Sequence, residues 1–280
     1  MLKSATDMLK KYKQIKTLPH VAIHLTKLLS DPNSTTQDFE QIIKMDPTLV
    51  GRLLRLVNSA YYGLRQKVST ISEAVVFLGL DNLRNMVVTS ALKEIFKKDS
   101  GNPYFSVNKL WLHCATSGIC CQMISERIFA HKGEDAFLCG ILHDIGMIVE
   151  YQIAPDDFLQ ACQNYKPEIK PFTKFEQDIL NTHHSEIGYL LADDWKVPNQ
   201  VQEGIKDHHN INRKVEPSSI SGIIQLSEYI VTKINYPAIP AMHPTLSQDM
   251  ALFFKNNFDE LKTMIQNMPE EIQKAKEIYE

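Results

Sequence analysis

The chain has 280 residues, of which 44% are hydrophobic and 22% charged, a balance that supports a globular protein with a sizeable core. Its formal net charge of −3 provides no basic excess for nucleic acid or for an anionic membrane surface, so neither is expected as a partner. The N-terminal residues are charged without an apolar run, and no window approaches the roughly 18 apolar residues that a membrane span requires.

The first hundred residues predict a series of helices. Ser34 with Gln37, and Thr70 with Glu73, fit the capping-box pattern that starts a helix before an apolar run. Residues 96–104 are rich in helix-breaking types and predict a linker. Apolar residues recur at helical spacing in segments near 4–14, 19–30, 35–44, 47–57 and 72–95.

The second part of the chain predicts longer helices. Thr173 with Glu176 repeats the capping-box pattern, which makes Glu176 a capping residue in this interpretation. Three prolines predict an irregular segment at 235–245, and a polar helical tail follows to Glu280. The expected helices lie near 106–130, 134–150, 155–163, 173–193, 198–208 and 217–234.

These patterns predict an all-α protein, because strong β-alternation is absent. We expect two lobes and a tail: an N-terminal helical bundle over residues 1–100, a second helical lobe over 101–240 and a helical tail over 241–280. The five cysteines have no framework spacing, which predicts reduced thiols and a cytoplasmic protein. No Walker loop, dinucleotide fingerprint or G-x-S-x-G motif assigns a catalytic residue or an organic cofactor.

Histidine and acidic residues on several predicted helices form a candidate metal site. Divalent metals bind neutral imidazoles and carboxylates that converge from rigid elements. The adjacent His143 and Asp144 project about 100° apart on a helix, so they can meet one metal or bridge two. Gly140 and Gly146 flank the pair and allow other helices to approach closely. The candidate metal ligands are His113, His143, Asp144, His184, His208, His209 and Glu228.

Two other interpretations apply to the same histidines. A lone histidine on an apolar helix is more often a core or surface residue than a ligand, and one member of each doublet, His183–His184 and His208–His209, faces solvent in that case. A nucleophilic Cys114 activated by His113 is disfavoured, because neighbours in sequence do not face each other on a helix.

The order of the candidate residues resembles the H…HD…H…H series of the HD-superfamily metal-dependent phosphohydrolases. The series here runs through His113, His143–Asp144, His184 and His208. That superfamily usually closes its site with an aspartate, and Glu228 stands at the matching position in this chain.

The rest of the chain resembles the HDOD family, the regulatory branch of that superfamily, over about residues 15–235. Three N-terminal segments match its opening helices: LPHVAIHLTKLL, MDPTLVGRLLRLVNSAYYG and VSTISEAVVFLGLDNLRNMVV. Trp111-Leu112-His113 resembles its W-x-H element, and GILHDIG resembles its HD element. The family's E…H…G…W-x-x-P order and its terminal histidine pair are matched by Glu176, His184, Gly188, Trp195, Pro198 and His208–His209.

The resemblance implies an HD-like helical fold in a bacterial, cytoplasmic signalling protein. Many HDOD members have lost metal residues, and no catalytic activity is established for the family. Asn58 and Ser59, with Tyr61 and Tyr62, match the family's N-S-A-x-Y-G loop. That loop is either a surface for a partner or ligand or simply a turn closed by its own asparagine.

Three hypotheses about function follow. The first is a non-enzymatic regulatory module that acts by binding a signalling protein or a ligand, with a retained metal site. The alternative is a metal-dependent phosphohydrolase acting on a nucleotide or a cyclic dinucleotide, in which the metal activates water. The third is a site that binds metal only to hold helices together.

Two features bear on the choice among them. Lys206, Arg213 and Lys214 are the candidate phosphate-binding cations beside the histidine pair. The residues after that pair read NINRKVEP, without the GYP segment of the HD-GYP phosphodiesterases, which disfavours that activity. The bound metal is expected to be iron, zinc, manganese or nickel, because imidazole and carboxylate ligands accept all four.

Overall fold

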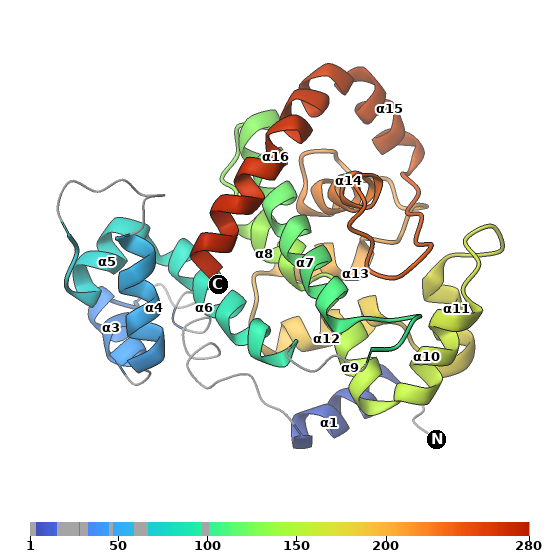
Figure 1. Cartoon of the computed structure of the whole chain (residues 1–280), viewed down its shortest axis with the longest axis horizontal. Helices are drawn as coiled ribbons and strands as arrows, with labels where there is room; N and C mark the ends of the chain where they lie inside the picture. The colour runs from blue at the N-terminus through green and yellow to red at the C-terminus, as the bar shows by residue number, and fades with distance from the viewer. Residues whose placement is uncertain are drawn as a thin grey trace. The chain divides into compact units, whose positions relative to one another are not determined.

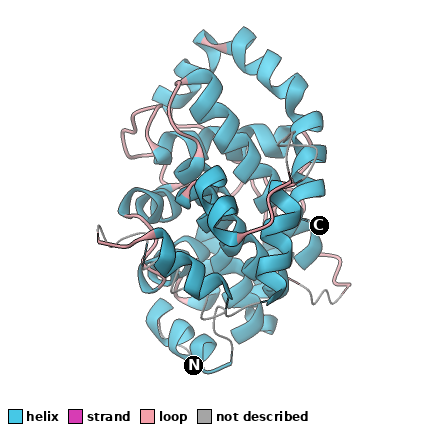
Figure 2. Ribbon diagram, turned by 90° about the vertical axis from the view of Figure 1, so that its left-hand side faces the viewer, coloured by secondary structure: helices cyan, strands magenta, loops and turns pink. Residues whose placement is uncertain are grey.

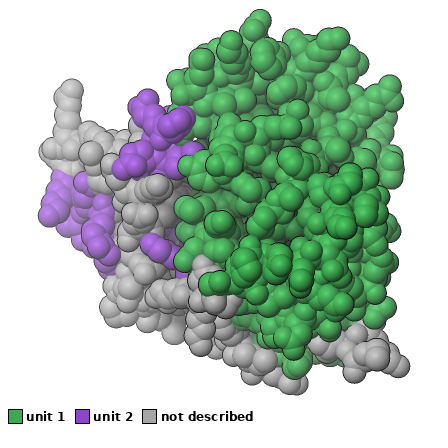
Figure 3. All heavy atoms as spheres, turned by 45° about the vertical axis from the view of Figure 1, so that its right-hand side comes forward, with its two compact units in different colours: residues 1–17, 95–268 green, residues 18–94, 269–280 purple. Residues whose placement is uncertain are grey.

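The computed structural model describes residues 4–15, 28, 33–44, 47–58, 67–96 and 101–279. These residues form helices and loops, and none of them lies in a strand (Figures 1 and 2). The predicted all-α class is therefore confirmed. Contacts divide the chain into two compact units (Figure 3), one with residues 1–17 and 95–268 and one with residues 18–94 and 269–280. The division predicted near residues 100 and 240 stays a prediction.

The unit of residues 18–94 and 269–280 is built on short helices: α3 (Thr36–Lys44), α4 (Pro47–Val57), α5 (Ile71–Leu78) and most of α6 (Leu80–Ile95). The first three pack against one another around buried apolar side chains such as Phe39 and Leu53. The helix predicted over 72–95 is broken at Gly79, whose φ of 75° favours glycine. The helix predicted over 19–30 lies outside the described residues, apart from residue 28.

One of the two capping boxes predicted in this unit is present as predicted, and the other starts one residue later. The Thr70–Glu73 capping box is confirmed by reciprocal hydrogen bonds. The box predicted at Ser34–Gln37 is wrong by one residue, because Thr35 and Asp38 bond each other instead. Asn58 accepts the Val68 N–H at 2.8 Å and donates to the Val68 carbonyl at 2.8 Å, which closes the loop on its own backbone. The loop residues 59–66 lie outside the described residues.

The larger unit, residues 1–17 and 95–268, carries the remaining helices. Helix α7 lies against α8 and α14, α9 lies against α12 and α1, and α13 packs against both α12 and α14. The helices are α1 (Ala5–Ile15), α7 (Val107–Met123), the π-helix η1 (Ile124–Ile128), α8 (Glu134–Leu142), α9 (Ile145–Ile153), α10 (Pro155–Asn164), α11 (Phe172–Leu180), α12 (His184–Asp194), α13 (Asn199–Asp207), α14 (Ile220–Lys233), α15 (Gln248–Asn256) and the first part of α16 (Phe258–Tyr279).

Two of the long helices predicted in this unit are interrupted. The helix expected over 134–150 breaks at His143 and Asp144, between α8 and α9. The helix expected over 173–193 breaks after Asn181, whose φ of 60° ends α11 before α12 starts at His184. In both cases the apolar period continues through the break, so periodicity alone did not reveal it.

The stretch Glu134–Ile153 is long and apolar enough to cross a membrane by length and composition, which the sequence analysis did not anticipate. In the structure 89% of its apolar window is buried inside the protein. Such burial is typical of core helices in folded domains, so this segment is weak evidence for a membrane span. The five cysteines are likewise all buried, and none is paired with another.

The core of the larger unit also contains ionisable side chains with almost no solvent exposure. An unpaired polar group in such a place costs stability, so a group of them needs partners or a bound ion. The acidic and histidine side chains with at most 1% exposure are His113, His143, Asp144, Glu150, Glu176, His184 and Glu228, and His208 follows at 3%.

Candidate metal centre

The His143–Asp144 pair sits where α8 ends and α9 begins. Two glycines set this position by letting other helices approach. A Cβ on Gly140 would lie 2.6 Å from the Ser117 carbonyl oxygen of α7, and a Cβ on Gly146 would collide with the His184 backbone at the start of α12. Asp144 stands at the N-cap position of α9 but makes no capping hydrogen bond, so its carboxylate is available for the interior. The close approach expected from the two glycines is thus observed.

Four residues form the first donor group: His113, His143, Asp144 and Glu228. Glu228 Oε1 lies 2.7 Å from His113 Nε2 and 3.0 Å from His143 Nε2. Asp144 Oδ2 lies 3.3 Å from His143 Nε2 and 3.6 Å from His113 Nε2. Helix α7, the α8–α9 junction and α14 therefore bring two imidazoles and two carboxylates to one point, with one donor atom from each residue within 4.8 Å of all the others.

Four residues form the second donor group: Asp144, His184, His208 and His209. Asp144 Oδ1 lies 3.3 Å from His184 Nε2 and 3.6 Å from His208 Nε2. The His209 ring lies beside the rings of His184 and His208, with centroids 4.9 and 4.0 Å away. One donor atom from each of these four residues also lies within 4.8 Å of the others.

Asp144 belongs to both groups, with one oxygen turned toward each. Neither of its oxygens has a hydrogen-bond partner among the described residues, although the side chain is fully buried. A bridging carboxylate between two cations would satisfy both oxygens, and two-metal sites place their ions about 3.5–4 Å apart. The seven residues singled out in the sequence are all brought together here, although whether they bind metal stays a prediction.

Backbone carbonyl oxygens orient three imidazoles of the donor groups by accepting hydrogen bonds from Nδ1. His113 Nδ1 lies 2.6 Å from the Tyr236 carbonyl oxygen, and His143 Nδ1 lies 2.7 Å from that of Gly140. A carbonyl oxygen only accepts hydrogen bonds, so each Nδ1 carries the proton and each Nε2 faces its donor group. His208 is held in the same way by the Ile205 carbonyl oxygen at 2.7 Å. Such outer partners are typical of metal-binding histidines.

Facing Nε2 atoms give physical evidence for a cation. His113 Nε2 lies 3.1 Å from His143 Nε2, and His184 Nε2 lies 3.3 Å from His208 Nε2. Two nitrogen lone pairs at this separation repel unless a proton or a metal ion lies between them. The residues therefore fit a divalent metal on both sides of Asp144.

The electrostatics of the groups agree with this arrangement. Burial alone would raise the pKa of Asp144, but His143 and the other histidines hold it well below its usual range. Burial alone would lower the pKa of His143, but Asp144 and Glu228 raise it well above its usual range. Burial and the neighbouring His208 lower the pKa of His209 well below its usual range. Protons on the imidazoles thus offset the negative charge of the carboxylates, and a bound metal would offset it in their place.

Glu176 has a different role from the one predicted. It is not a capping residue, because α11 starts at Phe172 without a side-chain cap. Its carboxylate is fully buried and accepts the His184 Nδ1–H at 2.7 Å, so it orients the imidazole of the second donor group. The capping-box interpretation is wrong because the spacing of Thr173 and Glu176 does not tell whether the glutamate caps the helix or makes a buried contact, here with His184.

Glu150 is a functional candidate that the sequence analysis did not identify. A donor atom of Glu150 lies within 4.8 Å of donor atoms of Glu176 and His184, and its own oxygens have no hydrogen-bond partner among the described residues. Burial and then the Glu176 charge raise its pKa well above its usual range. A lone acidic residue inside the apolar run IGMIVEYQI was the signal available in the sequence.

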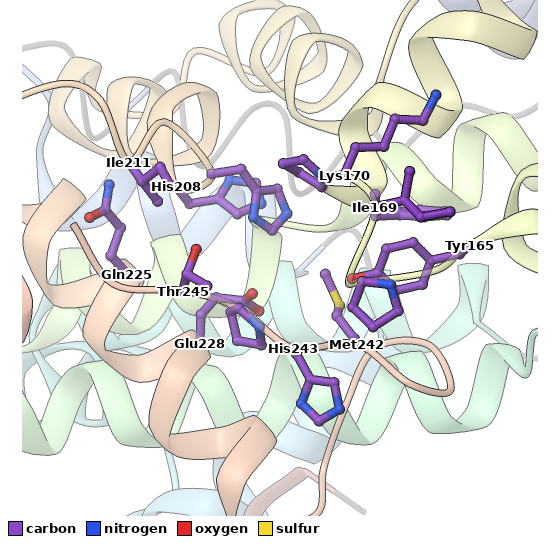
Figure 4. Close-up of a pocket in the computed structure, with 15 residues that line it drawn as sticks. Tyr165, Ile169, Lys170, His208, Ile211, Gln225, Glu228, Met242, His243 and Thr245 are labelled. Carbon is purple, nitrogen blue, oxygen red and sulfur yellow. The ribbon is translucent and has the colours of Figure 1, made fainter.

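A cavity of about 300 Å³ opens onto both donor groups (Figure 4). Its walls come from residues in three connecting segments, 165–172, 208–211 and 242–245, and from Gln225 and Glu228 of α14. Glu228 of the first donor group, with His208 and His209 of the second, lines it. A small molecule can therefore reach side chains of both groups.

The predicted phosphate-binding cations do not contribute to this cavity. Lys206 lies over the Tyr189 ring, and Arg213 forms an ion pair with Asp207. Neither residue, nor Lys214, is among those that line the cavity. His183 lies beside His184 but belongs to neither donor group, as the solvent-facing interpretation of that doublet allowed.

Two bacterial proteins are similar to this chain over part of their length. A protein of Treponema pallidum (strain Nichols) without an assigned function is 26% identical over 219 residues, which cover 75% of this chain and 40% of that protein. The cyclic di-GMP phosphodiesterase CdgJ of Vibrio cholerae is 24% identical over 210 residues, which cover 70% of this chain and 46% of CdgJ. The chain thus spans less than half the length of either relative.

Solved structures share the fold over nearly the whole chain. A protein of Shewanella amazonensis SB2B, provisionally assigned as a phosphohydrolase, matches with a TM-score of 0.72 and 25% identity, covering 99% of this chain and 97% of its own. An HDOD domain protein of unknown function from Geobacter sulfurreducens matches with a TM-score of 0.67 and 20% identity, covering 94% and 97%. The HDOD domain model matches residues 15–211, and this chain therefore belongs to the HDOD family.

Proposed function

We propose that this protein is a metal-dependent phosphoester hydrolase whose reaction centre holds two divalent ions. The observation that carries the proposal is the fully buried Asp144. Its two oxygens have no hydrogen-bond partner among the described residues, and each faces the histidines of one donor group. A signalling module without a metal would gain nothing from keeping this carboxylate and four imidazoles in a desolvated core. That cost argues for a bound metal, and the cavity that reaches Glu228, His208 and His209 favours a hydrolase over a module that only retains the metal.

Each donor group would hold one of the two ions. His113, His143 and Glu228 would hold one ion, His184, His208 and His209 the other, and Asp144 would contact both. Bound divalent ions supply Lewis-acid polarisation of a phosphoryl oxygen and activation of water at neutral pH.

The protein itself orients the imidazoles and leaves the donor groups accessible from the cavity. The backbone carbonyl oxygens behind the imidazoles fix which nitrogen faces inward, and Glu176 does the same for His184. The cavity exposes Glu228, His208 and His209, so a phosphate group can approach from that side. A substrate is expected to enter between the connecting segments 165–172 and 242–245.

Regulation by partner binding is the second candidate function. Membership of the HDOD family supports it, since the resemblance implies signalling roles. Val76 on α5 is 77% exposed and stands beside the exposed Phe77, which is a feature of surfaces that meet a partner. Hydrolysis and partner binding are compatible, because the donor groups lie wholly in residues 113–228 and α5 lies in the other compact unit.

The experiment that tests the proposed function measures metal and turnover together. Protein purified without an affinity tag is expected to hold close to two divalent ions by elemental mass spectrometry and to hydrolyse p-nitrophenyl phosphate after loading with iron, zinc, manganese or nickel. The variant Asp144→Asn is expected to lose most of the metal and the turnover. Asp193→Asn on α12, whose side chain is 58% exposed, is the matched control and should keep both.

The possible results separate the candidates. Folded wild-type protein that takes up no metal from any of the four salts would refute the hydrolase and leave the regulatory module. Two bound ions without turnover of any phosphoester would favour the interpretation in which metal only holds helices together.

A further inference from the structure

We propose that the cavity over the donor groups selects a small phosphomonoester with a single phosphate and an uncharged, largely apolar body, and that it excludes cyclic dinucleotides. This inference rests on the proposed function, because it takes the donor groups to be the site of the phosphate. It goes further by naming the chemical class of the rest of the substrate.

The size of the cavity sets the first limit. Its volume of about 300 Å³ lies at the lower end of the range of roughly 300–1,000 Å³ found for ligand sites. A cyclic dinucleotide contains two bases, two sugars and two phosphates, about twice the bulk of a single nucleotide. The space fits one phosphate on the donor groups and one ring-sized body above it.

The charge of the lining sets the second limit. Outside the donor groups, the basic side chains that line the cavity are Lys170 and His243. The ammonium group of Lys170 forms an ion pair with Asp178 and lies 4.4 Å from the centre of the Phe175 ring. Figure 4 shows the end of the Lys170 side chain extending away from the other labelled residues. A second or third phosphate would therefore find no lysine or arginine free to bind it among the lining residues, whereas a single phosphate would be held by the metal ions.

Apolar side chains form the entrance. Ile169 is 64% exposed and Ile211 is 38% exposed, and both line the cavity from different connecting segments. Met242 and Phe172 continue the apolar lining inward. Removing the exposed isoleucine side chains from water is most favourable when an apolar surface covers them. They therefore favour an aromatic or aliphatic body over a sugar or a further phosphate.

Gln225 is a buried polar residue in the wall of the cavity. Its side chain is 3% exposed and lines the cavity, and its amide N–H donates to the Asp207 carbonyl oxygen at 3.3 Å. Its Oε1 atom is buried without a partner among the described residues.

The test compares two ligands with one head group and different bodies. Isothermal titration of manganese-loaded protein with methylphosphonate and with phenylphosphonate measures what the body adds, independently of turnover. Phenylphosphonate should bind at least about tenfold more tightly, because its ring is buried against the apolar walls. Cyclic di-GMP should bind more weakly than phenylphosphonate.

Substitutions at the entrance identify where the body lies. Ile169→Asp and Ile211→Asp should each reduce the preference for phenylphosphonate several-fold while the metal content stays unchanged. Leu252→Asp is the matched control, because Leu252 is 58% exposed on α15 and does not line the cavity. It should leave the preference as it is in the wild type.

The outcomes keep the two proposals apart. If neither phosphonate binds to protein that carries its metal, the hydrolase proposal fails, and the inference fails with it. If both phosphonates bind equally, the head-group site stands and the inference is overturned. Tight binding of cyclic di-GMP, or a phenyl preference that survives both isoleucine substitutions, would also overturn the inference.

Discussion

Glu176 controls how well His184 can act as a ligand, because its carboxylate fixes the imidazole from the far side of the donor group. The substitution Glu176→Gln keeps the shape and removes the charge, so the metal affinity of the second donor group should fall about 10- to 100-fold. Competitive titration against a chelator measures this change. Glu203→Gln on the exposed face of α13 is the control, and equal affinities in the two variants would show that Glu176 does not orient His184.

Glu150 makes stability depend on pH in a predictable direction. Its pKa is raised above the ordinary 4.5 by burial and by Glu176, so the folded protein holds the proton more tightly than the unfolded chain. The stability from that proton is fully present below about pH 4.5 and is lost as the pH rises toward the folded pKa. Glutamine does not titrate, so Glu150→Gln should become more stable relative to the wild type as the pH rises.

Denaturant unfolding of both proteins after metal removal, from about pH 5 to about pH 8, measures this difference. The comparison cancels the titration of the neighbouring histidines to first order, because both proteins contain them. A free-energy difference that stays constant over this range would mean that Glu150 is ionised in the folded protein.

At the scale of elements, the close approach of α9 and α12 depends on Gly146. A Cβ at this position would collide with the His184 backbone carbonyl, so Gly146→Ala must displace the start of one of the two helices. The variant should lose about 1–3 kcal/mol of stability or more, together with metal affinity at the second donor group. Chemical denaturation and metal analysis measure the two effects.

Gly51 offers the opposite case in α4. Nothing lies within 4 Å of a Cβ built there, and the residue is exposed inside a helix. Gly51→Ala should therefore stabilise the protein by about 0.5–1 kcal/mol, because alanine has the higher helix propensity. Similar effects of the two substitutions would show that helix packing does not constrain Gly146.

At the scale of the whole molecule, metal should stabilise the unit of residues 1–17 and 95–268 selectively. All donor residues lie in that unit, and a ligand that binds only the folded state adds about 2.7 kcal/mol at a free concentration of 100 Kd. Differential scanning calorimetry should show a transition that moves to higher temperature with metal and to lower temperature with a chelator. The Asp144→Asn variant should show no such response, and a wild-type transition that ignores both additions would argue against metal in the folded core.

The sequence by itself determined the helical class, most helix positions and the set of seven candidate ligands. Helical periodicity and the Thr70–Glu73 cap are local properties, so they can be identified without knowing the fold. Histidines and acids are rare in apolar runs, which is why His113 and the His143–Asp144 pair stood out. The ordered motifs also supported the HDOD resemblance, which the family comparison confirmed.

The tertiary structure decided how those residues are used. Chain spacing does not tell how helices cross, so only packing through Gly140 and Gly146 shows that Asp144 is shared by two donor groups. The orienting contact of Glu176, the burial of Glu150 and the cavity between three connecting segments also depend on residues far apart in the chain. Long-range packing sets these features, so a local sequence pattern does not predict them.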